Sequence, residues 1–167
     1  MSNDNTLLVV AIALGAAAFL LAEDNANASS GAPVTSGSNN NGFAINNPGN
    51  IKWSSANNWQ GQIGQQNGFV VFDTLANGVR ALGILLTNYF SQGYQTITAI
   101  ITHYEGGDTV NNNIPAYITN VSNDVGEPAD SILSWPQDEV ALIQAIAHQE
   151  NGYNNMADSD VASYVGQ

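Results

Sequence analysis

Apolar residues recur at intervals of three and four in the second half of the chain, and this spacing constrains the fold more than any other feature. It places the apolar side chains on one face of a helix, which must then be buried. The clearest run lies between a capping residue, Asp73 or Thr74, and Gly93, which can end a helix. Its apolar positions are Leu75, Val79, Leu82, Leu86 and Tyr89.

Three further segments have helical spacing. The first covers residues 96–104. The second begins at Pro115, a favoured first-turn residue, and ends before Gly126. The third is predicted to begin at Ser134, where Gln137 completes an S-x-x-Q capping box, and to run to Gly152. These patterns predict a mainly helical domain.

Residues 59–73 predict one small β-hairpin. The extended pieces "WQGQI" and "FVVFD" flank the turn-forming sequence "GQQNG". The expected fold class is therefore mainly α, of the α+β kind, with a single hairpin.

The N-terminal part of the chain predicts a membrane anchor. Residues 7–22 form an uncharged apolar run of sixteen residues, about 24 Å long as a helix, against a hydrocarbon core of about 30 Å. The alternative is a secretory signal cleaved near Ala28, but the lack of any Lys or Arg before the run favours the anchor. We therefore expect an anchor over residues 1–24, a flexible polar linker over 25–42, and a folded domain over 43–167.

The charge balance excludes one large class of partner. The chain has 2 basic and 14 acidic residues, a formal net charge of −12, and this repels nucleic-acid phosphates. It has no cysteine, and His103 and His148 belong to no recognised metal-binding pattern. We expect no nucleic-acid partner, no metal and no cofactor.

Glu150 is the most unusual carboxylate in the sequence. It continues the apolar stripe of Ile143, Ile146 and Ala147 and lies in the last turn of its helix. Burial and the negative end of the helix dipole should both raise its pKa. A carboxylic acid that stays protonated near neutral pH can act as the general acid in glycosidic cleavage. The alternative is a frayed helix end with Glu150 in solvent.

Four sequence blocks carry a family resemblance. "LIQAIAHQENGYNN" (142–155), "ITHYEGGDTV" (101–110) and "IPAYITNV" (114–121) are similar to blocks of lytic transglycosylases and goose-type lysozymes. Residues 46–89, which contain "NNPGNIKW" and "FVVFD", resemble peptidoglycan glucosaminidases and small phage-encoded lytic proteins. The glutamate helix comes last here, so the chain looks like a circular permutant of the lysozyme-like fold. The family's Gly-Leu-Met-Gln stretch has no counterpart.

The resemblance implies roles for individual residues. Glu150 would be the catalytic acid, and Tyr104 matches the family's site tyrosine, although it could equally be a core aromatic. A second carboxylate, which hydrolysis commonly uses and transglycosylation does not need, would be Asp73, Glu105 or Asp108. Asp73 is equally suited to capping a helix, and Glu105 stands where the family has asparagine.

Four further residues are candidates for substrate binding. Asn47 and Asn50 could present amides to N-acetyl groups, or could be ordinary turn residues in "NNPGN". Trp59 and Gln60 could form a stacking platform with a neighbouring amide, or a packing pair in the hairpin.

The implied function is a lytic transglycosylase or lysozyme that cleaves the MurNAc–GlcNAc β-1,4 bond of peptidoglycan. The anchor suggests a phage virion protein that opens the cell wall locally during entry. Its expected location is a virion internal membrane or the host cell envelope. Its partners would be glycan strands, lipid around residues 7–22 and other virion proteins. The alternative is a non-catalytic structural or glycan-binding virion protein.

Overall fold

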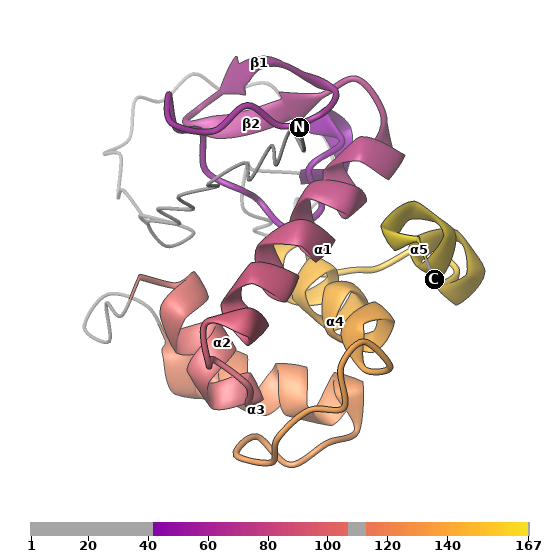
Figure 1. The fold of residues 1–167 in the computed structure, drawn as a ribbon. Helices are drawn as coiled ribbons and strands as arrows, with labels where there is room; N and C mark the ends of the chain where they lie inside the picture. Colours follow the sequence, from indigo (N-terminus) through magenta and orange to yellow (C-terminus); the bar gives the residue numbers. More distant parts are fainter. Residues whose placement is uncertain (1–41, 107–112, 167) are drawn as a thin grey trace, which may run out of the picture.

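The computed structural model describes residues 42–106 and 113–166 (Figure 1). A short 3-10 helix, η1 (Gly42–Ile45), precedes the hairpin of β1 (Gln62–Gln66) and β2 (Phe69–Phe72). Five helices follow: α1 (Leu75–Ser91), α2 (Ile97–Tyr104), α3 (Ile114–Val125), α4 (Glu139–Asn151) and α5 (Asp158–Val165). The mainly helical class with one antiparallel hairpin is therefore confirmed.

The predicted anchor over residues 1–24 lies outside the described residues, as does the predicted linker up to residue 41. Among the helices of the described part, none has the length and apolar character needed to cross a membrane.

Local sequence signals set most of the helix ends. The hydroxyl of Thr74 caps α1 by accepting a hydrogen bond from the Asn77 amide, and the hydroxyl of Thr96 caps α2 in the same way. Gly126 ends α3 in the left-handed conformation, as the sequence predicted.

The hairpin turn consists of Asn67 and Gly68 alone. Both have positive φ, 52° and 83°, and the flanking residues Gln66 and Phe69 are paired. This is the geometry of a tight two-residue turn, so β1 extends further into "GQQNG" than the sequence suggested. On its other side, β2 is paired with residues 51–53, because the Val70 amide donates to the Ile51 carbonyl at 2.9 Å.

The prediction for the start of α4 was wrong. The helix begins at Glu139, and Ser134 forms no capping box with Gln137. Pro136 disfavours the helical conformation of the residue before it, and this prevents a helix from starting at Ser134. Instead, the Asp138 carboxylate accepts a hydrogen bond from the Ser134 amide at 2.7 Å. The sequence analysis did not identify α5 as a helix.

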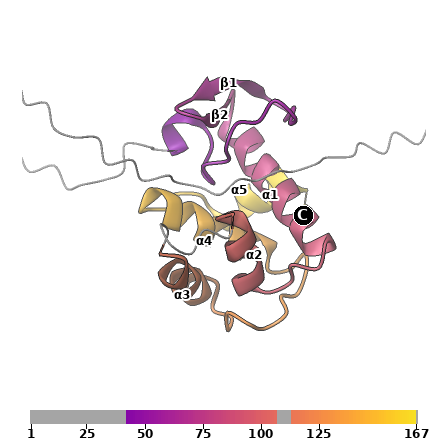
Figure 2. The same cartoon turned by 90° about the vertical axis from the view of Figure 1, so that its left-hand side faces the viewer.

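The helix α1 lies at the centre of the fold. Its inner face is buried against the hairpin and against α2, α4 and α5, and Val79, Leu82, Leu86 and Tyr89 are completely buried. Figures 1 and 2 show the hairpin and η1 at one end of α1, with α2, α3 and α4 toward the other.

Gly78 allows the loop after η1 to lie directly on α1. A Cβ atom at this position would be 1.8 Å from the carbonyl oxygen of Asn46. The loop therefore passes α1 at backbone contact and continues toward the end of α4.

Candidate functional site

The carboxylate of Glu150 is held from two sides at the end of α4. The Tyr117 hydroxyl, from α3, donates to Oε1 at 2.8 Å. The Asn50 side-chain amide, from the loop after η1, donates to Oε2 at 3.0 Å. Three residues distant in sequence thus form one hydrogen-bonded cluster.

Burial raises the pKa of Glu150. The hydrogen bonds from Tyr117 and Asn50 and the positive charge of Lys52 oppose this shift without reversing it. Although atoms closely surround the carboxyl group, the residue as a whole remains partly exposed. The expected raised pKa and the position in the last helical turn are both present, and Glu150 is not frayed into solvent.

Glu105 is the second acidic group of the cluster. It follows α2, is only 4% exposed, and burial together with the nearby Glu150 charge raises its pKa to about 8. Lys52, one of the two basic residues in the chain, lowers the pKa of both carboxyl groups. Burial is the larger of these two causes, and it favours the protonated form of both carboxyl groups.

Tyr104 supports the cluster indirectly. It is buried at the end of α2, and its hydroxyl donates to the carbonyl oxygen of Gly49. It thus holds the loop that carries Asn50, while the tyrosine bonded to Glu150 is Tyr117. The sequence analysis gave Tyr117 no role of its own, although the residue lies in the block "IPAYITNV" that resembles the family.

The loop is also tied to the residue after Glu150. The side chain of Asn151 accepts from the Gly42 amide at 2.8 Å and donates to the Pro48 carbonyl at 2.8 Å. Asn50, Glu150 and Asn151 therefore join the beginning of the domain to the end of α4.

Asn47 has a structural role and not the predicted substrate-binding one. It is completely buried, and its amide donates to the carbonyls of Ile51 and Val70, both at 2.9 Å. Its side-chain oxygen accepts from the Ile51 amide. All of its polar atoms are used to fold the loop, which agrees with the alternative of a turn residue.

Trp59 and Gln60 do not form the predicted platform. Trp59 is only 8% exposed and belongs to the hydrophobic core, so it lacks an open ring face. Gln60 is exposed and accepts a hydrogen bond from Arg80. The burial of Trp59 agrees with the alternative of a packing residue.

Asp73 lies at the start of α1 and is exposed. The Asn77 side chain donates to it at 2.7 Å and lowers its pKa. Thr74 is the capping residue proper, and Asp73 supports the same first turn. Asp108 lies outside the described residues.

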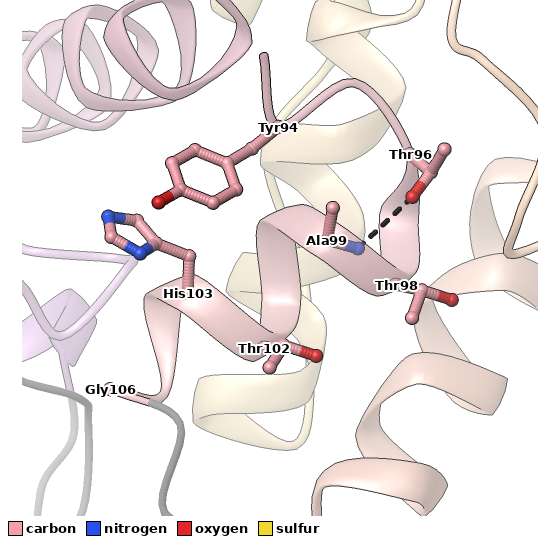
Figure 3. A pocket seen from close by; sticks show the side chains of 7 residues that line it. All are labelled: Tyr94, Thr96, Thr98, Ala99, Thr102, His103 and Gly106. Atoms are coloured by element: carbon pink, nitrogen blue, oxygen red, sulfur yellow. Dashed lines mark hydrogen bonds between the residues drawn. The ribbon is translucent and has the colours of Figure 1, made fainter. Parts of the chain in front are cut away.

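The two histidines have partners that the sequence did not reveal. His148 pairs with Asp124 at 2.6 Å between α4 and α3. His103 stacks on Tyr94 with ring centroids 4.2 Å apart, and burial lowers its pKa. Both rings line a hollow of about 480 Å³ along α2, together with Thr96, Thr98 and Thr102. Figure 3 shows the rings of Tyr94 and His103 side by side.

Within the described ranges, no cluster of three or more His, Asp or Glu side chains is arranged to hold a metal ion. No protein-family model matches the chain. The chain likewise has no match among curated proteins. Arguments about function therefore depend on the site itself.

Proposed function

We propose that the chain is a peptidoglycan lytic transglycosylase that acts on the MurNAc–GlcNAc β-1,4 bond, with Glu150 as its general acid. The main observation that supports this proposal is the environment of Glu150, whose carboxyl group combines a raised pKa with hydrogen bonds from Tyr117 and Asn50. We further propose that the domain is a circularly permuted member of the lysozyme-like superfamily, on the sequence resemblance alone.

The proposed reaction uses one carboxyl group twice. Protonated Glu150 gives its proton to the glycosidic oxygen as the bond to the MurNAc C1 atom breaks. The resulting carboxylate is stabilised by its hydrogen bonds from Tyr117 and Asn50. It then removes the proton from the MurNAc 6-hydroxyl while O6 bonds to C1, which gives a 1,6-anhydro product and restores the acid.

The state of Glu105 favours this route over hydrolysis. A hydrolase of the usual kind needs a second, ionised carboxylate as base or nucleophile. With a pKa of about 8 and 4% exposure, Glu105 is neutral and enclosed at pH 7. Asp73 is engaged at the first turn of α1. A hydroxyl group of the substrate itself is therefore the better nucleophile.

The proposed setting is a membrane next to the cell wall. Residues 1–24 would anchor the protein in a virion internal membrane or the host envelope, and the polar segment after them would let the domain reach glycan strands. Other virion proteins are further proposed partners, with a secreted form cleaved near Ala28 as the alternative.

Zymography of the full chain on peptidoglycan tests the proposal. Wild type should clear the gel, and Glu150→Gln should lose at least about a hundredfold in rate because it cannot supply a proton. Glu127→Gln, at an exposed position, is the matched control and should clear normally. Mass spectrometry of the products should show 1,6-anhydro-muramic ends.

Equal clearing by wild type and Glu150→Gln would refute the role of Glu150. Reducing ends instead of anhydro ends would identify a hydrolase. If wild type binds peptidoglycan but clears nothing, the chain is the non-catalytic glycan-binding protein of the alternative.

A further inference from the structure

The side-chain amide of Asn50 has one polar atom with a partner and one without. Its Nδ2 group donates to Glu150 Oε2 at 3.0 Å and, more weakly, to the Glu150 carbonyl oxygen at 3.4 Å. Its Oδ1 atom has no hydrogen-bond partner among the described residues, although Asn50 is only 6% exposed. An enclosed amide oxygen without a partner is costly. The strong hydrogen bond from Nδ2 to a negatively charged carboxylate offsets that cost.

The unpaired oxygen of Asn50 lies among other oxygen atoms. A Cβ atom added to Gly42 would be 2.7 Å from Asn50 Oδ1, 2.9 Å from Asn151 Oδ1 and closer still to the carbonyl oxygen of Asn47. Three acceptors therefore converge on one side of Gly42, and none of them can donate to another. A donor in the place of Asn50 Oδ1 would have two acceptors beside it.

The protonated form of Glu150 requires an acceptor that the present arrangement does not offer. A carboxylic acid carries an O–H group that donates, whereas the side chains of Tyr117 and Asn50 both donate to the Glu150 carboxyl group. Burial favours this protonated form. One of the two neighbours must therefore become an acceptor when Glu150 takes up its proton.

Asn50 can become that acceptor at a lower cost than Tyr117. Tyr117 is 8% exposed, and within the described ranges its hydroxyl makes no second hydrogen bond. If it accepted from Glu150, its own proton would be left unpaired. If the Asn50 amide turns over instead, Oδ1 faces Glu150, and Nδ2 lies beside the oxygens of Asn47 and Asn151. Both polar atoms of the amide then face suitable partners.

We propose that the Asn50 amide turns over with the protonation of Glu150, so that Oδ1 accepts from Oε2–H of the acid and Nδ2 donates to Oε2 of the carboxylate. This inference rests on the proposed function and deepens it, because it assigns the transferable proton to Oε2. Tyr117 donates to Oε1 in both states. Asn50 is thus a positioning residue that stabilises the acid before glycosidic cleavage and the carboxylate after it.

Other ionisable groups lie near Glu150 on the surrounding elements. Tyr104 and Tyr117, on α2 and α3, have pKa values that burial raises well above the ordinary range, so both stay neutral. Glu105 has a pKa of about 8, and Lys52 carries a positive charge. Because Glu105 also titrates, its protonation has to be separated from that of Glu150.

Nuclear magnetic resonance of the isotope-labelled full chain tests the proposal. The carbon-13 shift of the Glu150 carboxyl group reports its protonation during a titration from about pH 5 to about pH 10. While Glu150 is protonated, the Asn50 NH2 protons should show a strong nuclear Overhauser contact to the Gly42 Hα protons. That contact should be lost as Glu150 ionises. The Asn47 amide is the internal control, because its donor and acceptor atoms all have fixed partners.

A Gly42 contact that is absent while Glu150 is protonated, or present while it is ionised, would overturn the proposal. Glu105→Gln should keep the dependence on pH, and Glu150→Gln should abolish it. The reverse result would assign the change to Glu105 and also overturn the proposal. Failure of the proposed function is read separately, from clearing by the wild type, because the spectra involve no turnover.

Discussion

Glu105 is a carboxylic acid kept almost entirely out of water, and the stability of the domain should depend on its protonation. Its pKa is about 8 in the folded protein, against an ordinary value of 4.5. Between these two values the folded state holds the proton more strongly than the unfolded chain does. The stabilisation of the fold by this proton is complete below about pH 4.5, and it is lost as the pH rises through 8.

Glu105→Gln should therefore flatten the pH dependence of stability. The wild type loses up to about 1.4 kcal/mol of unfolding free energy per pH unit through this group, and the variant does not. In thermal unfolding at pH 5, 7 and 9, the stability of the variant relative to the wild type should increase as the pH rises. Glu127→Gln, at an exposed position, should differ from the wild type in unfolding temperature by the same amount at each pH. If Glu105→Gln also differed from the wild type by the same amount at each pH, the result would contradict a raised pKa for the buried carboxyl group of Glu105.

At the scale of single elements, Gly78 in α1 shows that helix propensity and packing can have opposite effects. Alanine is favoured over glycine inside a helix by about 0.5–1 kcal/mol. At Gly78, however, a Cβ atom would be 1.8 Å from the backbone oxygen of Asn46, a contact that cannot be relieved by rotating a side chain.

Gly78→Ala should lower the unfolding free energy by about 2 kcal/mol or more, because the loop after η1 must move off α1. Since that loop carries Asn50, peptidoglycan clearing should fall as well. Gly64→Ala is the control, because a Cβ atom in β1 would meet no atom within 4 Å. Denaturant unfolding measures both variants. A Gly78→Ala protein more stable than wild type would show that the loop does not contact α1.

At the scale of the whole molecule, electrostatic repulsion is the dominant long-range effect. The chain has 14 carboxylates and 2 basic residues. Lys52 lies near Glu105 and Glu150, and Arg80 donates to the neutral Gln60. Among the residues that the structure describes, most acidic side chains are exposed, and they repel one another through water.

Salt should stabilise this domain and assist its activity. Raising NaCl from 0.01 to 0.1 M shortens the screening length from about 30 to about 10 Å and weakens repulsion within the protein and from an anionic wall. The unfolding temperature and the clearing rate should both rise over this range. Potassium chloride should act equally, because screening does not depend on the ion's identity. A fall in the unfolding temperature would show that attractive ion pairs dominate instead.

The main elements could be predicted from the sequence because their signals are local. Periodicity and capping residues identified α1, α2 and α3, and Asn67-Gly68 marked the hairpin. The start of α4 was misjudged because Pro136 outweighed a short capping pattern. The helix α5 is short and was not predicted, since its burial against α1 is a tertiary effect.

The candidate site was only partly predictable, for a physical reason. Helical spacing alone placed Glu150 on a buried stripe and predicted its raised pKa, because both follow from one helix. Its partners Tyr117 and Asn50 lie 33 and 100 residues away, and only the packing of α3 and the loop against α4 brings them together. The same packing enclosed Asn47 and Trp59 and left Tyr153 exposed. Sequence determined which elements form, whereas tertiary structure decided which side chains meet, because burial depends on residues that are distant along the chain.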